Sequence, residues 1–289
     1  MSHKFRGTGV ALVTPFTADG QVDFDALKRV VNHTIEGGVN FLVALGTTAE
    51  TPTLSKDEKA QVLATIIEAN NGRVPVVCGV GGNNTAEVVR QLKENNLEGV
   101  DGILTVVPYY NKPTQEGMYQ HFKAIAETTD KDIILYNVPG RTVANMLPTT
   151  TLRLANEFKH IVAVKEASGN MAQCMEIING APEHFAVLSG DDDLVMPQIA
   201  CGMQGVISVA ANCFTKDFTD MVNSALEGDF ATSRSLHYKL LVGIRLLFAE
   251  GNPAGVKCVL EQMELCGCGV RLPLVKASKE LHNNIKNYL

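Results

Sequence analysis

Residues 9–47 read GVALVTPFTADGQVDFDALKRVVNHTIEGGVNFLVALGT, and this stretch contains the unit from which the rest of the chain is built. The runs 9–15 and 41–47 are apolar without polar alternation, which is typical of strands buried on both faces. The segment 23–38 between them carries apolar residues at helical spacing. A strand, a helix and a second strand in this order predict a parallel βαβ unit.

The same pattern continues along the chain. Further apolar runs occupy 74–79, 102–108, 133–139, 161–167, 185–191 and 205–212, and each is followed by an amphipathic segment. Eight strand–helix pairs over about 220 residues predict an α/β protein with a (β/α)8 TIM barrel. A doubly wound sheet is the alternative, but open sheets usually hold fewer strands. Gly79 to Asn84 only half match a dinucleotide-binding fingerprint, because the third glycine is missing.

The strand signal stops at Asp229. Segments 230–250, 253–267 and 273–288 have the composition of helices, and no low-complexity linker precedes them. We therefore expect a catalytic barrel over residues 1–228. Residues 229–289 are expected to form a three-helix appendage outside the barrel, within the same compact domain.

Composition narrows the classes of function. The formal net charge is −6 and no block of Lys and Arg occurs, which argues against a nucleic-acid partner. No segment approaches the roughly 18 apolar residues of a membrane helix. Seven cysteines without a paired C-x-x-C predict free thiols and a cytoplasmic location. The histidines lack metal-ligand spacing, and Asp191 to Asp193 are expected to be solvated or to cap a helix, so we expect no metal.

Lys165 ends the apolar run 161–167, at the point where burial should stop. An apolar surrounding disfavours an ammonium relative to the neutral amine, which is a nucleophile. Alternatively, the stem lies on the core and the head reaches water or pairs with Glu166. In a barrel, however, the carboxyl ends of the strands line the site. The polar residues that end the other strands are Thr14, Thr47, Thr48, Tyr109, Tyr110, Tyr136 and Asp191.

An amine surrounded by phenols and hydroxyls suits imine chemistry. The amine condenses with a ketone, the protonated imine accepts electrons, and hydroxyl groups move protons. Three motifs, GTTAE (46–50), YNVPGRT (136–142) and VKEASGN (164–170), resemble the lysine Schiff-base lyases, a family that includes N-acetylneuraminate lyase and dihydrodipicolinate synthase. PYYNKP (108–113) and Arg141 resemble the synthase branch of this family more than the sialic-acid branch.

The resemblance implies catalytic roles. Lys165 would form the imine with pyruvate, and Tyr136 would donate and accept protons beside it. Thr48 would relay protons between Tyr136 and Tyr110. In this family the tyrosine matching Tyr110 comes from the neighbouring subunit of a tight dimer, and the assembly is a dimer of dimers. The covalent imine would make an added cofactor unnecessary.

The resemblance also implies binding roles. Thr47 and Thr48 would hold the pyruvate carboxylate, and main-chain carbonyls of Gly190 and Ile207 would line the pocket. Arg141 would bind the carboxylate of L-aspartate 4-semialdehyde through two parallel donors. The product would be 4-hydroxy-tetrahydrodipicolinate, a precursor of diaminopimelate and lysine.

Other interpretations stay open at this point. The tyrosines could be phenols with satisfied hydroxyls at a core edge, Thr47 and Thr48 a capping pair, and Arg141 a solvated charge. The chain could be a sister lyase acting on a sugar acid such as N-acetylneuraminate. It could also be a barrel that binds an oxoacid without turning it over.

Regulation is a separate expectation from the resemblance. In family members that lysine inhibits, the effector lies near residues matching Thr51, Asn83, Glu87 and Tyr109. Histidines in those members match Lys56 and Lys59 here. Lysine is cationic at pH 7 whereas histidine is mostly neutral, so a cationic effector would be repelled. We expect weak or absent inhibition by L-lysine.

Overall fold

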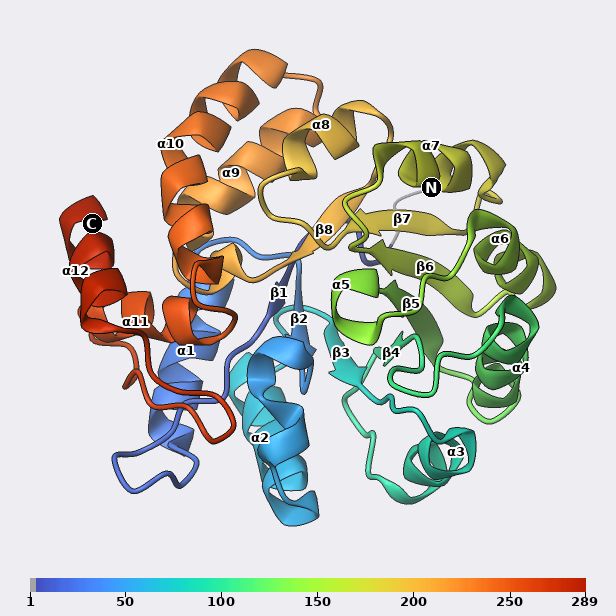
Figure 1. The fold of residues 1–289 in the computed structure, drawn as a ribbon, viewed down its shortest axis with the longest axis horizontal. Helices are drawn as coiled ribbons and strands as arrows, with labels where there is room; N and C mark the ends of the chain where they lie inside the picture. Colours follow the sequence, from blue (N-terminus) through green and yellow to red (C-terminus); the bar gives the residue numbers. More distant parts are fainter. Residues whose placement is uncertain (1–3) are drawn as a thin grey trace.

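The structure is a computed structural model that describes residues 4–289, and its centre is a closed barrel of eight parallel strands (Figure 1). Each strand pairs with the next along the chain, and β8 pairs with β1 to close the ring. The predicted (β/α)8 barrel is confirmed. The strands are β1 (Gly7–Ala11), β2 (Phe41–Ala44), β3 (Val76–Gly79), β4 (Gly102–Val106), β5 (Asp132–Asn137), β6 (Ile161–Glu166), β7 (Ala186–Ser189) and β8 (Gly205–Ser208).

A ring of helices surrounds the barrel. Several begin at a side-chain cap, as at Ser55, whose hydroxyl and the Glu58 carboxylate form a reciprocal capping box. The helices of this ring are α1 (Phe24–Glu36), α2 (Lys56–Asn70), α3 (Thr85–Glu94), α4 (Gln115–Ala126), α6 (Pro148–Glu157), α7 (Met171–Gly180), α8 (Val195–Ala200) and α9 (Thr215–Leu226).

Several strands are shorter than their apolar runs. The run 205–212 leaves the sheet after Ser208, and Ala210–Asn212 form the short helix η3. After β2 the chain forms η1 (Thr47–Ala49) and η2 (Thr51–Thr53), and after β5 it forms α5 (Pro139–Thr142). Residues 205–213 are nevertheless all buried, so apolar character at these strand ends reports burial rather than strand pairing.

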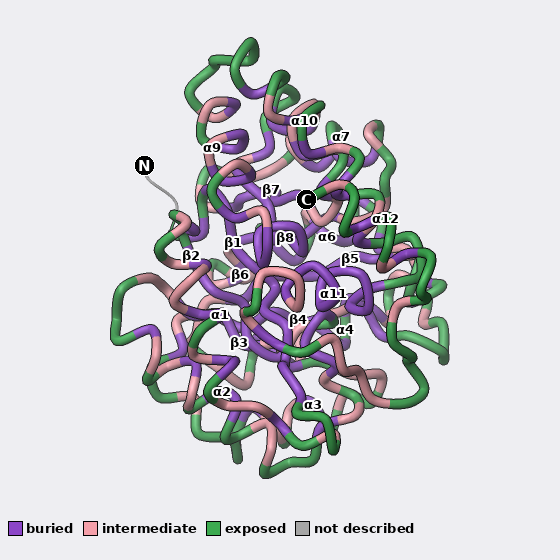
Figure 2. Tube along the Cα trace, turned by 90° about the vertical axis from the view of Figure 1, so that its left-hand side faces the viewer, coloured by how far each residue is buried: buried purple, intermediate pink, exposed green. Residues whose placement is uncertain are grey.

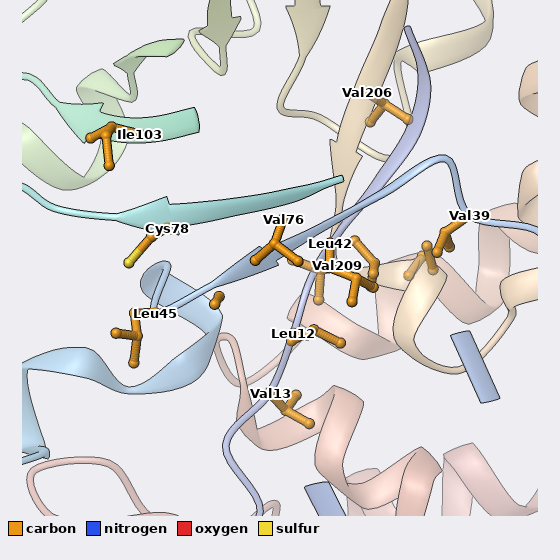
Figure 3. Close-up of a cluster of buried hydrophobic side chains, with 14 of the residues drawn as sticks. Leu12, Val13, Val39, Leu42, Leu45, Val76, Cys78, Ile103, Val206 and Val209 are labelled. Carbon is orange, nitrogen blue, oxygen red and sulfur yellow. The ribbon is translucent and has the colours of Figure 1, made fainter. Parts of the chain in front are cut away.

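Buried side chains form two layers separated by the barrel wall. One fills the barrel interior and includes Phe5, whose ring meets Phe41 edge to face at 5.5 Å. The other lies between the strands and the helices. Figure 3 shows part of this outer layer, with Leu42 from β2 and Val76 and Cys78 from β3. Figure 2 colours the chain by burial and shows that the central strands are buried, whereas the outer turns are exposed.

Three helices follow the barrel, as the sequence predicts: α10 (Phe230–Phe248), α11 (Ala254–Gln262) and α12 (Lys279–Tyr288). α10 packs on α8 and α9 (Figure 1). α11 contacts η3. Among the described residues, none of the helices has the length and apolar character needed to cross a bilayer.

A buried ion pair joins this C-terminal segment to the loop after β2. Lys257 Nζ on α11 lies 2.5 Å from Glu50 Oε1, and both side chains are fully buried. Lys257 Nζ also donates to the Gly269 carbonyl at 2.8 Å, while the Arg271 backbone N–H donates to Glu50 Oε2 at 2.9 Å. Burial lowers the pKa of Lys257, and the nearby Glu50 carboxylate opposes that effect. Breaking one half of such a pair costs more than removing both halves.

Lys257→Met would leave the Glu50 carboxylate buried without its cation, and we expect the free energy of unfolding to fall by about 3–5 kcal/mol. The double variant Glu50→Gln/Lys257→Met should recover much of that loss. Urea unfolding followed by circular dichroism measures both. Lys216→Met, which removes an exposed ion pair with Asp220, is the matched control and should change little. A single variant as stable as the double variant would contradict the prediction.

Candidate active site

A cavity of about 190 Å³ opens at the carboxyl ends of the strands. Its lining comes from the barrel, from the loops after β2, β5, β6, β7 and β8, and from the C-terminal segment. The lining residues are Ala11, Gly46, Thr47, Thr48, Leu104, Tyr136, Val138, Arg141, Lys165, Ala167, Gly190, Asp191, Val209, Phe248 and Asn252.

Lys165 lies beside Tyr136 on neighbouring strands, as the sequence predicts. The two residues are register partners on β5 and β6, and Lys165 Nζ is 4.4 Å from the centroid of the Tyr136 ring. Strand alternation directs Ala163 and Lys165 to the barrel interior and Glu166 to the outside. Lys165 is only 6 % exposed and lines the cavity, so its side chain is largely shielded from bulk solvent.

Glu166 does not serve as the partner of Lys165. Its carboxylate accepts hydrogen bonds from Asn137 Nδ2 at 3.0 Å, from the Ser168 backbone N–H at 2.9 Å and from Gln173 Nε2 at 3.2 Å. Burial raises the pKa of Glu166, and these donors act against that rise. The network braces the loop after β5, because Asn137 Oδ1 also accepts from the Met146 backbone N–H at 2.9 Å.

Gly190 leaves room for the lysine side chain. A Cβ atom at this position would lie 2.5 Å from Ala167 Cβ and 3.1 Å from Lys165 Cε. The Gly190 backbone N–H donates to the Glu166 carbonyl at 2.8 Å, which fixes the close approach of the two strand ends. A larger residue here would displace Lys165.

The two threonines of the loop after β2 both reach the cavity, but differently. Thr47 is exposed at the mouth, whereas Thr48 is buried and its Oγ1 accepts a hydrogen bond from Asn252 Nδ2 at 2.9 Å. The expectation that Thr14 also points into the mouth is wrong. Thr14 is fully buried beneath this loop and donates to the Ala49 carbonyl at 2.8 Å, so it supports the turn that carries Thr48.

Arg141 lies on α5 at the exposed edge of the cavity, whereas two other predicted site residues lie outside it. Tyr110 is 88 % exposed, and its backbone has a left-handed φ of +72°. Ile207 on β8 is 1 % exposed and lies in the barrel interior. The residue that lines the cavity after β8 is Val209. Within one chain the structure brings together Lys165 and Tyr136 but not Tyr110.

Phe248 and Asn252 are cavity residues that sequence reasoning did not identify. They lie at the end of α10 and just before α11, in the segment expected to pack away from the site. No periodic pattern marks them. The one available signal was local, an amide residue in the Gly251–Pro253 break between two apolar helices.

The three consecutive aspartates separate in space. Asp191 lines the cavity, and Asp193 is exposed. Asp192 is buried, and its Oδ2 accepts from the backbone N–H groups of Val209 at 3.0 Å and Ala210 at 2.8 Å. Within residues 4–289, no cluster of three or more His, Cys, Asp or Glu side chains is arranged to hold a metal ion.

These features define a class of protein: a (β/α)8 barrel with a buried amine, a phenol and threonine hydroxyls around one small cavity, which suits imine chemistry on small carbonyl compounds. The chain matches the model of the Dihydrodipicolinate synthetase family over residues 4–289 and belongs to that family.

Individual relatives agree with this assignment. The 4-hydroxy-tetrahydrodipicolinate synthase of Flavobacterium psychrophilum is 53 % identical over 281 residues, covering 97 % of this chain and 96 % of the relative. A solved monomeric variant of dihydrodipicolinate synthase has a TM-score of 0.96 at 40 % identity, covering 99 % and 96 % of the two chains. A lysine-bound DHDPS structure from Cyanidioschyzon merolae has a TM-score of 0.95 at 34 % identity, covering 99 % and 98 %.

Proposed function

We propose that this protein is a lyase that condenses pyruvate with L-aspartate 4-semialdehyde to give 4-hydroxy-tetrahydrodipicolinate, for diaminopimelate and lysine biosynthesis. The observation that carries the proposal is the buried Lys165 amine against the Tyr136 ring at the carboxyl ends of β6 and β5. Family membership and the names of relatives at about half identity support the synthase over a sugar-acid lyase.

The proposed reaction begins when the Lys165 amine adds to the ketone of pyruvate and water leaves. The protonated imine then draws electrons from the adjacent methyl group, which loses a proton to give an enamine that attacks the aldehyde. Because the imine is the electron sink, the reaction requires no added cofactor. The Tyr136 hydroxyl is the group that moves protons at this centre.

Thr48 lines the same cavity as Tyr136, and its hydroxyl keeps the donor that the proposed relay requires. Its Oγ1 already accepts from the Asn252 amide, so its own O–H remains available to donate. In the proposed relay this hydroxyl returns a proton to the Tyr136 oxygen as the phenol gives one up. Asn252 therefore has a positioning role in this scheme.

Substrate binding in this scheme follows the charges of the lining. Thr47 and Thr48 hold the pyruvate carboxylate, and the Gly190 carbonyl lines the pocket, whereas Ile207 lies outside the cavity. Arg141, at the exposed edge, binds the carboxylate of the semialdehyde through its planar pair of donors.

We further infer that the protein is a homo-oligomer, a dimer of dimers in which Tyr110 completes the site of the neighbouring subunit. The backbone around Tyr110 is held in place, because Asn83 Nδ2 donates to the Tyr109 carbonyl at 3.1 Å and Asn111 Nδ2 donates to the Asn83 carbonyl at 2.8 Å. An aromatic ring that is 88 % exposed on such a fixed backbone is suited to insertion into a partner.

We also infer that residues 229–289 act as one unit with the barrel of residues 1–228. Asn252 contacts Thr48 and Lys257 pairs with Glu50, so the C-terminal segment holds the loop that carries two site threonines. A cytoplasmic location is proposed as well. All seven cysteines are free, and five of them are buried.

Lys165→Ala should abolish borohydride trapping of pyruvate and reduce turnover by several orders of magnitude, because no imine can form. Mass mapping of the wild-type protein should place the pyruvate adduct on Lys165. Lys159→Ala, an exposed lysine just before β6, is the control and should keep trapping. Trapping that persists in Lys165→Ala would move the imine to another lysine. Trapping without turnover in the wild-type protein would favour a non-catalytic oxoacid-binding barrel.

Tyr110→Phe should lower kcat strongly with little loss of stability, because the exposed hydroxyl contributes little to folding. Mixing Tyr110→Phe with Lys165→Ala should restore activity after subunit exchange, since a mixed dimer contains one complete site. Tyr238→Phe, another exposed tyrosine, is the matched control and should be active by itself. No recovery under demonstrated exchange would show that each site is built within one chain.

Free L-lysine should inhibit weakly. Glu87, which could receive an ammonium group, is already bound by Arg90 at 2.9 and 2.7 Å, and this pairing holds the pKa of Glu87 down to about 2. Lys56→His/Lys59→His should increase sensitivity while leaving the uninhibited rate unchanged. Initial rates at subsaturating pyruvate measure both. Half-inhibition of the wild-type protein below ~1 mM, worth about 4 kcal/mol, would show that the two lysines are tolerated.

A further inference from the structure

The Asp191 carboxylate lies in the cavity without a role in the scheme above. Among the described residues that line this cavity, three are charged: Lys165, Arg141 and Asp191. Asp191 is therefore the one anionic group available there to a positively charged part of a substrate. Its position is fixed, because its backbone N–H donates to Ser189 Oγ at 3.0 Å and its Oδ2 accepts from the Gly169 N–H at 3.2 Å.

Asp191 and Arg141 stand on either side of the strand that carries Lys165. Arg141 follows β5, Lys165 lies on β6 and Asp191 follows β7, and these three strands are consecutive neighbours in the barrel. A cation on one side of the reacting amine and an anion on the other match a substrate that carries both charges. The amino-acid end of L-aspartate 4-semialdehyde has a carboxylate for Arg141 and an ammonium for Asp191.

We propose that Asp191 binds the ammonium group of the second substrate and accepts the proton that ring closure releases. This inference rests on the proposed function, because it concerns the step that follows carbon–carbon bond formation. It makes Asp191 both a specificity-determining and a catalytic residue.

Proton balance in ring closure requires such an acceptor. At that stage the pyruvate carbon is bonded to Lys165 as a protonated imine, and the substrate nitrogen is an ammonium. The nitrogen loses a proton, its lone pair attacks the imine carbon, and the π electrons move to the Lys165 nitrogen. The bond from this carbon to the Lys165 nitrogen then breaks as the cyclic imine forms.

The hydrogens of this step can be counted. The ammonium carries three and the imine nitrogen one, whereas the nitrogen of the neutral cyclic imine carries none. Lys165 leaves as an ammonium with three of these hydrogens. The remaining proton passes to Asp191 and then to solvent.

The surroundings of Asp191 suit a proton acceptor at neutral pH. Burial raises its pKa to about 6, the Gly169 N–H and Lys165 oppose this rise, and Asp192 and Asp193 in the same loop add to it. Burial raises the pKa of the Cys174 thiol on α7 to about 12, and the nearby Glu166 and Asp191 carboxylates add to this rise. A carboxylate whose protonated form has a pKa near the working pH is a better proton acceptor than an ordinary aspartate.

If Asp191 had only a structural role, its substitution would have different effects. The hydrogen bond that Asp191 accepts from Gly169 needs only an oxygen acceptor, and Asn supplies one at the same place. If Asp191 were only a turn residue, Asp191→Asn would change stability slightly and the kinetics for both substrates equally.

The test compares Asp191→Asn with Asp193→Asn, its exposed neighbour in the same loop. For Asp191→Asn we expect borohydride trapping of pyruvate to persist and kcat/KM for the semialdehyde to fall by about 100-fold. The inhibition constant of succinate semialdehyde, which has no amino group, should stay within about threefold of the wild-type value. At neutral pH, Asp193→Asn should match the wild-type protein in trapping, in kcat/KM for the semialdehyde and in the inhibition constant of succinate semialdehyde.

The pH profile supplies a second readout. In the wild-type protein, kcat/KM for the semialdehyde should decline as pH falls through about 6, because protonated Asp191 can no longer accept a proton. Asp191→Asn should not show this decline at acidic pH, whereas Asp191→Glu should still show it. Should Asp191→Asn not fold, Asp191→Ser replaces it in the same comparison.

Two results would overturn the inference: equal weakening of the semialdehyde and its deamino analogue, or an unchanged kcat/KM in Asp191→Asn. Failure of the proposed function is distinguishable, because it would appear as absent trapping of pyruvate in the wild-type protein.

Discussion

Closure of the barrel between β8 and β1 is the constraint on which the site depends. The seam pairs Gly7 with Gly205, and a Cβ atom at Gly205 would lie 2.1 Å from the Gly7 carbonyl oxygen. Gly205 also has φ of +155°, at the edge of the region that L side chains rarely adopt. Once the ring closes, all eight carboxyl ends meet at one rim, and residues more than 200 positions apart, such as Thr48 and Asn252, hydrogen-bond there.

The rim places one amine in a position that is both dry and accessible. Alternation along β6 turns Lys165 inward, the absence of a Cβ at Gly190 leaves space for its stem, and Tyr136 lies beside its Nζ. The next residue, Glu166, faces the outer layer and is satisfied by amide donors, so it does not neutralise the amine. The same alternation that forms the core therefore keeps Lys165, the proposed nucleophile, apart from the nearest carboxylate along the chain.

Sequence reasoning captured the parts of the structure that depend on repetition and strand order. Eight apolar runs predicted the barrel, and strand count placed Tyr136 beside Lys165. It could not place the residues that depend on the path of irregular segments. Thr14 ends its run in the same way as Lys165 but turns under the β2 loop, and Asn252 reaches the cavity from a helix break without a periodic signal. Tyr110 follows β4 but is exposed, and strand order alone did not predict that it lies outside the cavity of its own chain.

The buried and half-buried carboxylates of this fold differ in the groups that donate hydrogen bonds to them. Glu50 meets a lysine and a backbone N–H, Glu166 meets side-chain amides, and Asp192 meets two backbone N–H groups. Each of these acids joins segments that are distant in the chain, and each faces protein donors. Asp191 has a single backbone donor on Oδ2 and borders the cavity. Asp192 Oδ1 also lacks a hydrogen-bond partner, but Asp192 does not line the cavity. Of these four acids, Asp191 is therefore the one that is both incompletely hydrogen-bonded and within reach of a cationic ligand. This difference in partners, rather than the presence of three adjacent aspartates, distinguishes the acid that can act on a substrate from those that hold the fold.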